Sequence, residues 1–309
     1  MNREEIRIPI ADIRRLTLHD GPGIRDTVFV KGCPLRCLWC HNPESISPRP
    51  QLLFHENLCT GCRTCAAVCP AGVHRFDAAG RHLIDRDRCV ACGKCVEGCL
   101  SSALTLCGGV RYTAREVFDR VARDRDFYGT DGGVTVSGGE PLLYPEFVGE
   151  LFRLLHEAGI HTALDTCGAV PFGNFEAVLG ATDLVLYDIK GMDAERHKAN
   201  TGRDNAEILQ NLAELGRRHV PIEIRMPIVP GGNDDAAEID AAGRFLAGIP
   251  SLERVRLLAY HSLARNKYLA AGMPDTMPDV PPPSPQHLAE LREMLAKRLA
   301  CEILLPPGA

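Results

Sequence analysis

The amino-acid sequence predicts an α/β protein with a parallel sheet and a small cysteine-rich insert. From Thr27 onward, short apolar runs rich in β-branched residues alternate with stretches of helical period. This alternation is typical of parallel strands joined by crossover helices. It breaks between residues 54 and 104, a segment that holds eight of the 14 cysteines and few apolar residues. We therefore expect one large domain, residues 1–53 and 105–309, and an inserted metal-binding domain at residues 54–104, referred to below as the insert.

Length and composition are those of a globular protein. The chain has 309 residues, of which 45% are hydrophobic, enough for a sizeable core. A formal net charge of -5 argues against a broad basic surface, so nucleic acid is not an expected partner. The first residues mix acids and bases, unlike a signal or transit peptide, and no apolar run approaches the ~20 residues that cross a bilayer. We expect a cytoplasmic protein with no membrane partner.

Six apolar runs are predicted as strands, and polar or glycine-bearing residues follow each of them. The runs are Thr27–Lys31, Val134–Ser137, His161–Asp165, Leu184–Asp188, Ile222–Met226 and Val255–Leu258. Parallel barrels and α/β sheets build their sites at the carboxyl ends of the strands. The six segments that follow the strands should therefore meet at one rim: Gly32-Cys33-Pro34, Gly138-Gly139-Glu140, Thr166-Cys167-Gly168, Ile189-Lys190, Val229-Pro230-Gly231 and Tyr260-His261.

Three helix starts are marked by capping side chains. The pairs are Thr113 with Glu116, Asp204 with Glu207, and Ser284 with Pro285. Apolar stripes that should face the sheet follow two of them: Ile208, Leu209, Leu212 and Leu215 in one helix, and Leu288, Leu291, Leu295 and Leu299 in the last. The proline-rich stretch 274–285 is expected to be an extended surface connection.

The cysteines of the insert fall into two runs of C-x₂-C-x₂-C-x₃-C spacing. Because cytosolic thiols stay reduced, metal ligation explains them better than disulfides. The spacing is that of bacterial ferredoxins, in which the fourth cysteine of each run ligates the other cluster. We expect one four-iron cluster on Cys59, Cys62, Cys65 and Cys99, and a second on Cys89, Cys92, Cys95 and Cys69. Zinc or disulfides would account for eight cysteines less economically. Leu100 stands where the second run would carry a proline, which predicts a looser turn there but leaves the ligation unchanged.

A third cysteine group, Cys33, Cys37 and Cys40, has C-x₃-C-x₂-C spacing directly after the first predicted strand. Three thiolates can hold three irons of a four-iron cluster and leave the fourth iron open to another ligand. The alternative is structural zinc with His41 as fourth ligand, but adjacent Cys40 and His41 would chelate awkwardly. The remaining cysteines, Cys107, Cys167 and Cys301, have no motif partners and are interpreted as small buried hydrophobes.

Two sets of motifs carry a resemblance to a known family. The three-cysteine motif, with Trp39 before its last cysteine and Gly138-Gly139-Glu140 further along, resembles the radical S-adenosylmethionine (SAM) superfamily. More narrowly, the chain resembles the activating enzymes of glycyl radical enzymes, whose best-known member acts on pyruvate formate-lyase. The motifs that carry this narrower resemblance are Asp20-Gly21-Pro22-Gly23-Ile24-Arg25, Lys31-Gly32-Cys33-Pro34-Leu35-Arg36-Cys37 and His41-Asn42-Pro43-Glu44. The resemblance covers essentially the whole chain and implies a partial (β/α)₆ barrel.

The resemblance implies an oxidoreductase that cleaves SAM reductively and uses the 5′-deoxyadenosyl radical to take hydrogen from a backbone glycine. Three 4Fe-4S clusters are then expected, one at the SAM site and two in the insert. A glycyl radical enzyme would be the partner, and a flavodoxin- or ferredoxin-type protein would supply electrons. Two alternatives are a radical SAM enzyme acting on a small molecule or RNA, and an electron-transfer protein, which would leave the barrel unused.

The family also implies roles for individual residues near SAM. Gly138, Gly139 and Glu140 would hold its amino group, although a glycine pair alone predicts only a tight turn. Asp165, Thr166, Asp188 and Lys190 match positions that contact SAM or a monovalent cation, where two acids could also simply end strands. Trp39, Arg225 and His261 fit further SAM-contacting positions. Asp20 would lie where the partner's glycine loop enters, whereas the sequence alone reads it as a turn residue.

Overall fold

A nine-stranded sheet forms the larger domain of the protein, whose computed structural model describes residues 5–306. In spatial order the strands are β13 (Glu302–Leu304), β12 (Leu252–Ala259), β11 (Ile222–Ile228), β10 (Leu184–Asp188), β9 (His161–Thr166), β8 (Gly133–Gly138), β2 (Arg25–Val30), β1 (Ile8–Thr17) and β7 (Arg111–Tyr112). From β13 to β2 all neighbours are parallel, whereas β1 and β7 join antiparallel. Within residues 5–306 the edge strands β13 and β7 do not pair with each other, so the barrel is partial, as expected.

The six predicted strands are confirmed, but three strands of this sheet were missed. Strand β1 carries Asp12, Arg14 and Arg15 and pairs with β2 through two register shifts. Its exposed charges hide the apolar alternation that marks a strand. Strands β7 and β13 are only two and three residues long, too short to show any period.

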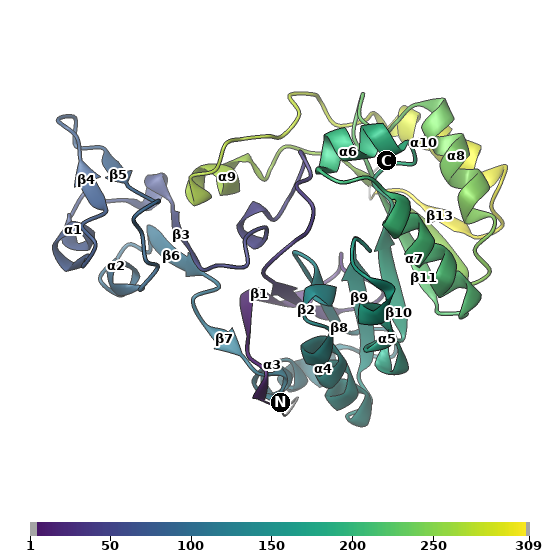
Figure 1. Ribbon diagram of the computed structural model, residues 1–309, viewed down its shortest axis with the longest axis horizontal. Helices are drawn as coiled ribbons and strands as arrows, with labels where there is room; N and C mark the ends of the chain where they lie inside the picture. Colours follow the sequence, from purple (N-terminus) through teal and green to yellow (C-terminus); the bar gives the residue numbers. More distant parts are fainter. Residues whose placement is uncertain (1–4, 307–309) are drawn as a thin grey trace.

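Helices cover the outer face of the sheet (Figure 1). They are α3 (Ala114–Val121), α4 (Pro145–Glu157), α5 (Phe172–Glu176), α7 (Ala206–Arg217), α8 (Ala236–Leu246) and α10 (Pro285–Ala296). Two further helices lie away from this face: α6 (Ala194–Thr201), whose last residues bind the loop after β2, and α9 (Arg265–Ala271), which packs on the segment 43–54. The predicted stripes of α7 and α10 contribute Ile208, Leu212, Leu215, Leu288, Leu291 and Leu295 to the main core. None of the helices among residues 5–306 is long and apolar enough to cross a membrane.

Two of the three predicted helix starts are confirmed. Thr113 and Glu116 form a complete capping box at the start of α3, and the Ser284 side chain accepts a hydrogen bond from the His287 amide at the start of α10. Both motifs satisfy backbone amides that the first helical turn leaves without partners.

The predicted start of α7 is wrong by one residue. The helix begins at Ala206 with Asn205 as its N-cap, because the Asn205 side chain turns inward to the carbonyl oxygens of Gly191 and Met192. Asp204 binds only the amide of Ala206. At the other end of the chain, Leu299 is buried in the core but lies beyond the end of α10.

The insert projects from one side of the barrel on a two-stranded stem (Figure 1). The stem consists of β3 (Gln51–Phe54) and β6 (Leu104–Cys107), so the boundaries expected at residues 54 and 104 fall at the ends of these strands that lie away from the barrel. Between them lie α1 (Thr64–Val68), β4 (His74–Phe76), β5 (His82–Ile84) and α2 (Lys94–Glu97). The side chains of Leu52, Cys65, Cys95 and Leu104 form its small core.

Candidate active site

The loop that carries Cys33, Cys37 and Cys40 follows β2 and is tied down at both ends. The amide of Gly32 donates to the carbonyl of Ser45 at 2.7 Å, which closes the loop at its base. Further along, the amides of Arg36 and Leu38 donate to the last residues of α6, Thr201 and Asn200, at 2.7 and 2.9 Å. The three cysteines are therefore held on one fixed loop, and each is half-buried.

The three thiols of this loop differ in their acidity. Burial raises the pKa of Cys37 to about 12 and that of Cys40 to about 11, whereas a hydrogen bond from the Cys167 thiol lowers the pKa of Cys33. Metals bind thiolates, so thiols that resist ionisation on their own need the positive charge of iron to lose their protons. Cys167, which follows β9, thus lies against the cysteine loop, and its position after a strand was the only signal of this in the sequence.

His41 is turned away from a four-ligand arrangement with the cysteines. Its ring stacks on that of His261, with ring centres 4.2 Å apart, and its Nε2 donates to the His261 carbonyl oxygen at 3.1 Å. Trp39 lies in a second hydrophobic cluster with Val229, Tyr260, Ala264, Tyr268 and Met277. These contacts fasten the cysteine loop to the segment after β12.

Gly138 and Gly139 bring the end of β8 directly against the cysteine loop. Gly138 has a φ of 113°, and a Cβ there would lie 2.4 Å from the Val30 amide nitrogen, so only glycine fits. The Gly139 amide donates to the Val30 carbonyl at 2.9 Å, and the Glu140 amide donates to the Gly32 carbonyl at 2.7 Å. The glycine pair is therefore more than a turn, because it allows β8 and the cysteine loop to touch.

Glu140 is fully buried and joins the ends of β8 and β9. Its Oε1 accepts from the Thr166 hydroxyl at 2.8 Å and the Leu142 amide at 3.0 Å, and its Oε2 accepts from the Cys167 amide at 2.9 Å. Burial raises the pKa of the Glu140 carboxyl, although these donors oppose the shift. The carboxylate therefore already holds the Thr166-Cys167 turn in place, a role that the sequence did not reveal.

Asp165 on β9 and Arg225 on β11 form an ion pair that leaves one hydrogen-bonding atom of each side chain without a partner among residues 5–306. Asp165 pairs with Arg225 at 3.2 Å and accepts from the Ser137 hydroxyl at 2.6 Å. Both side chains are nearly buried, yet Asp165 Oδ1 and Arg225 Nε have no hydrogen-bond partner within residues 5–306. Burial raises the pKa of Asp165. Burial alone would lower the pKa of Arg225, but the negative charges of Asp165, Asp188 and Asp20 outweigh it and raise that pKa. Such orphaned polar atoms fit a polar ligand.

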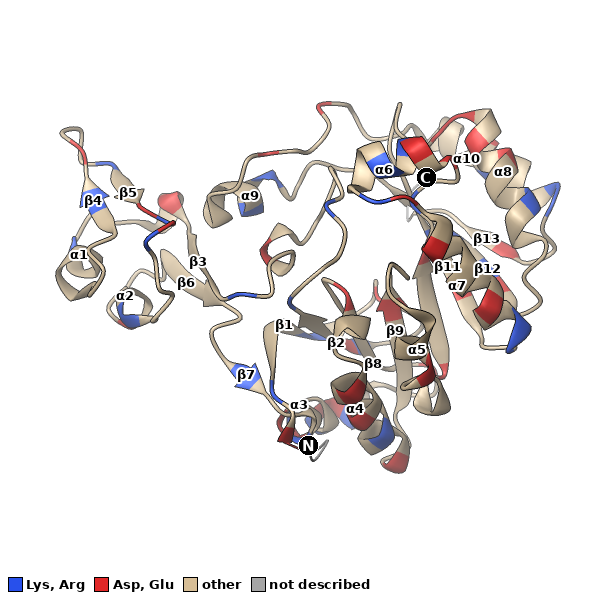
Figure 2. Ribbon diagram, viewed as in Figure 1, with Lys and Arg blue, Asp and Glu red and all other residues tan. Residues whose placement is uncertain are grey.

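Asp188 and Lys190 form a second pair at the end of β10. The Lys190 ammonium lies 2.6 Å from Asp188, and both side chains are largely buried. Burial alone would lower the pKa of Lys190, but Asp188 and the neighbouring side chains of Cys37 and Cys167 raise it, so the amine keeps its charge. Figure 2 shows acidic residues near the ends of β8 and β9, next to this region.

Asp20 lies before β2 and is held by threonines. Its Oδ2 accepts from the Thr27 hydroxyl at 2.8 Å and lies 3.4 Å from the Thr17 hydroxyl, while the Thr135 hydroxyl donates to its carbonyl oxygen at 2.6 Å. The side chain is half-buried and close enough to influence the charges of Asp165 and Arg225. Asp20 therefore has a fixed orientation close to Asp165 and Arg225.

Three buried or half-buried cations, two of them within the motifs, received no role from the sequence. Arg25 is fully buried and donates to Thr135 at 2.7 Å and to the Val134 carbonyl at 3.0 Å, which explains the end of the Asp20-to-Arg25 motif. Lys31 donates to Glu44 of the cysteine loop and to Gln51 of the stem. Lys267 donates to Asn42 and Glu44 from α9. Arg25 and Lys31 were marked in the sequence by a charge inside a motif, whereas Lys267 lies in no motif, and only the fold identifies the partners of all three.

The eight cysteines of the insert line two separate hollows. One is lined by Cys59, Cys62, Cys65 and Cys99 together with Phe54, Phe76 and His82. The other is lined by Cys69, Cys89, Cys92 and Cys95 together with Val73 and His74. The fold thus groups the fourth cysteine of each run with the first three of the other run. Four sulfurs around a hollow suit a four-iron cluster, which needs four thiolates and space for its own sulfides.

Both domains match known protein families. Residues 89–242 match the radical SAM superfamily, residues 51–100 match a 4Fe-4S dicluster domain, and residues 19–67 match a 4Fe-4S single cluster domain. Among solved structures, SuiB of Streptococcus suis shares the fold with a TM-score of 0.52 and 12% identity, over 63% of this chain and 43% of SuiB.

Curated relatives match nearly the full length. The chain is 38% identical to the indoleacetate decarboxylase activating enzyme of Tractidigestivibacter scatoligenes, over 94% of this chain and 95% of the relative. It is 36% identical to the 4-hydroxyphenylacetate decarboxylase activating enzyme of Clostridioides difficile, over 98% of both chains. It is 39% identical to the benzylsuccinate synthase activating enzyme of Thauera aromatica, over 86% of this chain and 83% of the relative. The chain therefore belongs to the glycyl-radical-enzyme activating enzymes of the radical SAM superfamily.

Proposed function

We propose that this protein activates a glycyl radical enzyme from a site built on Cys33, Cys37, Cys40 and the carboxyl ends of β8 to β12. One observation carries the proposal: a three-cysteine loop lies against Gly138 and Gly139, beside Asp165 and Arg225, each of which has one buried polar atom without a partner among residues 5–306. Three cysteines leave one iron of a four-iron cluster open. When bound, the cluster and SAM supply the electron and the 5′-deoxyadenosyl radical that takes a hydrogen atom from the partner's glycine.

The residues around the loop would bind and orient SAM. The carbonyl groups of Gly138 and Gly139 suit its amino group, and Asp165 Oδ1 and Arg225 Nε offer one free acceptor and one free donor. Glu140 and Thr166 would act mainly by holding the rim, since they already bind each other. Trp39 and His261 brace the loop and would act on SAM through the position of the loop.

The Asp188–Lys190 pair would face the carboxylate end of SAM. A lysine that stays charged can bind a carboxylate directly, while a freed Asp188 suits a monovalent cation, because oxygen ligands favour hard ions. We propose the cation as part of the loaded site on this ground.

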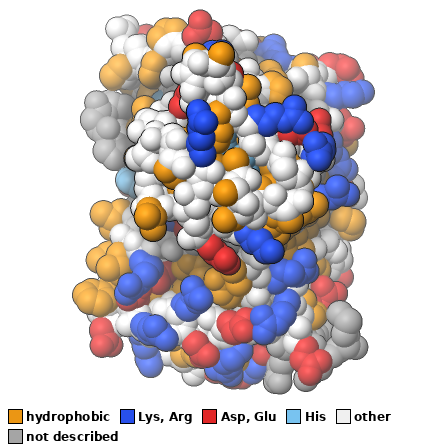
Figure 3. All heavy atoms as spheres, turned by 90° about the vertical axis from the view of Figure 1, so that its left-hand side faces the viewer, with side chains coloured by type: hydrophobic (Ala, Val, Ile, Leu, Met, Phe, Trp, Pro, Cys, Tyr) orange, Lys and Arg blue, Asp and Glu red, His pale blue; other side chains and the backbone are white. Residues whose placement is uncertain are grey.

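We further propose that the insert, residues 54–104, holds two four-iron clusters, so that the chain carries three. Cys62 and Cys92 are exposed and would be the points where electrons enter. Figure 3 shows this end of the molecule, where basic side chains stand among hydrophobic ones. Exposed Arg63, Arg75, Arg88 and Lys94 on the insert suit an acidic flavodoxin- or ferredoxin-type donor.

The activity is tested directly by electron paramagnetic resonance (EPR). Anaerobically reconstituted and reduced protein is mixed with SAM and, in turn, with a 4-hydroxyphenylacetate decarboxylase, an indoleacetate decarboxylase and a benzylsuccinate synthase. We expect a glycyl doublet with one of these partners and 5′-deoxyadenosine formed in step with it. Release of 5′-deoxyadenosine without a protein radical in any mixture would instead favour a small-molecule or RNA substrate.

Two matched cysteine variants distinguish the cysteines of the proposed site from a cysteine outside it. Cys37→Ala should abolish both 5′-deoxyadenosine and the doublet while leaving the insert clusters in place. Cys301→Ala removes a cysteine that lies at the far edge of the sheet, next to β13, and should change neither. Retained SAM cleavage in Cys37→Ala would refute the assigned site.

A further inference from the structure

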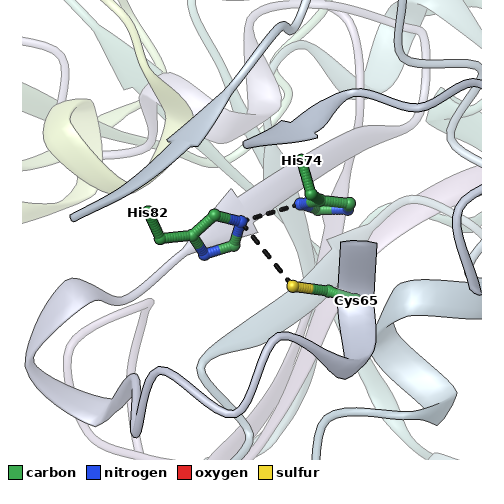
Figure 4. Close-up of side chains that lie close together, drawn as sticks. All are labelled: Cys65, His74 and His82. Atoms are coloured by element: carbon green, nitrogen blue, oxygen red, sulfur yellow. Dashed lines mark hydrogen bonds between the residues drawn. The ribbon is translucent and has the colours of Figure 1, made fainter. Parts of the chain in front are cut away.

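Two hydrogen-bonded histidines lie between the two cysteine-lined hollows of the insert. His74 on β4 and His82 on β5 face each other, with 2.9 Å between His74 Nδ1 and His82 Nε2 (Figure 4). His82 lines the hollow of Cys59, Cys62, Cys65 and Cys99, and His74 lines the hollow of Cys69, Cys89, Cys92 and Cys95. The pair is thus the direct polar link from one hollow to the other.

Both rings are held firmly. The His82 ring stacks on Phe76 at 4.7 Å between ring centres and meets the edge of Phe54 at 4.6 Å. His74 is only 6% exposed and pairs opposite Ile84 in the β4–β5 ladder. Neither ring is therefore free to rotate toward water in search of another partner.

The proton positions follow from what each nitrogen faces. His74 Nε2 is buried and has no hydrogen-bond partner among residues 5–306. In its hollow the ligand sulfurs, and the sulfides of a cluster, can only accept hydrogen bonds, so Nε2 is satisfied when it carries the proton. A neutral His74 then has a bare Nδ1, which must accept from His82 Nε2. The His82 Nε2 atom also lies 3.7 Å from Cys65 Sγ, on the side of the other cluster. The His82 Nδ1 atom, which this assignment leaves without a proton, has a sulfur only at the longer distance of 4.0 Å, in Cys59, so Nε2 is the better placed donor.

We infer that His74 donates a hydrogen bond to the cluster on Cys69, Cys89, Cys92 and Cys95, and that His82 positions it in the donating tautomer. The inference rests on the proposed pair of insert clusters. Reduction adds negative charge to a cluster, and a fixed N–H donor stabilises that charge, so the donor raises the reduction potential. His74 is thus a residue that sets the potential of one insert cluster relative to the other.

An alternative is that Cys65, His74 and His82 together bind a single metal ion. The ligand atoms of Cys65, His74 and His82 all lie within 4.8 Å of one another. That arrangement would remove Cys65 from its hollow and leave three cysteines there. The hydrogen-bond assignment is preferred because it keeps four cysteines in each hollow, and the experiment below distinguishes the two.

The test is a redox titration of the full, reconstituted protein followed by EPR, with the site cluster identified by its response to SAM. In His74→Phe, which keeps an aromatic ring but has no donor, we expect the iron content to stay unchanged while the midpoint potential of one insert cluster falls. An exchangeable proton coupled to ¹⁵N-labelled histidine should be visible by electron–nuclear double resonance (ENDOR) in the reduced wild-type protein and absent from this variant.

Further variants decide the remaining outcomes. His82→Phe leaves His74 in place without its hydrogen-bond partner and should lower the midpoint potential of the same cluster and weaken the same ENDOR coupling. If His74→Phe loses a cluster, this second variant still tests the inference. His55→Phe changes a histidine of the insert that lines neither hollow and should alter nothing. Unchanged potentials and couplings in both His74→Phe and His82→Phe would overturn the inference. One tightly bound zinc with missing iron in the wild type would overturn the cluster assignment itself.

Discussion

Glu140 illustrates how a residue can belong to a motif and still act through its neighbours. The motif implied contact with SAM, yet the carboxylate accepts three hydrogen bonds, two of which join the end of β8 to the end of β9. A sequence pattern predicts the residue but not these two partners, because Thr166 ends a different strand and Cys167 follows it. The same applies to Arg25, whose buried guanidinium binds residues of β8 that are more than a hundred positions away.

At the residue scale, the sharpest prediction concerns Asp20. Thr17 and Thr27 fix its carboxylate in the region of Asp165 and Arg225, but no residue of the cysteine loop binds it. Asp20→Ala should therefore leave uncoupled SAM cleavage nearly unchanged while lowering glycyl radical formation steeply. A displacement of about 1 Å in a reacting group can cost about a hundredfold in rate. The two rates are measured as 5′-deoxyadenosine and as EPR spin count.

Asp12→Ala is the control, since Asp12 is exposed on β1 and pairs only with Arg14. Equal loss of both activities in Asp20→Ala would assign Asp20 to SAM binding or folding. No change in either would leave it as a turn residue.

At the scale of elements, the parallel strands and the capped helices were predictable because they are determined locally. Long buried strands show continuous apolar runs, and Thr113 with Glu116 lie within one helical turn of each other. Strand β1 was not predictable from its charges, since its position depends on pairing with β2. The start of α7 shifted because Asn205 found a tertiary partner, which no local pattern encodes.

The capping box of α3 gives a prediction for one element. Thr113→Ala leaves the amide of Glu116 without its side-chain acceptor and should cost about 1 kcal/mol of folding free energy. For a protein of this size the anaerobic melting temperature should fall by about 2 °C, measured by differential scanning fluorimetry. Thr130→Ala, at an exposed turn position, should have no measurable effect. An equal shift in both variants would mean that the cap contributes nothing specific.

At the scale of the whole molecule, the grouping of the insert cysteines was predictable from spacing, whereas the histidines between them were not. The ferredoxin spacing predicts which cysteines ligate the same cluster. His74 and His82 belong to no motif, and only the pairing of β4 with β5 brings their rings together.

This grouping predicts how cysteine variants pair. Cys59→Ala and Cys99→Ala should damage the same cluster and give matching EPR spectra, although the two positions lie far apart in the chain. Cys89→Ala should damage the other cluster. Wild-type protein should contain about twelve irons per chain, measured by chemical iron assay. Matching spectra for Cys99→Ala and Cys89→Ala would contradict cross-ligation.

The stem of β3 and β6 has a consequence for the ancestry of the enzyme. Gln51 lies opposite Cys107 and Phe54 opposite Leu104, so the chain leaves the barrel and returns to it at neighbouring points. A gene segment could be spliced in or cut out between these points and replaced by a tight turn, with the order of the barrel strands untouched. The insert, with the two clusters proposed for it, can therefore be gained or lost in evolution independently of the radical chemistry at the rim.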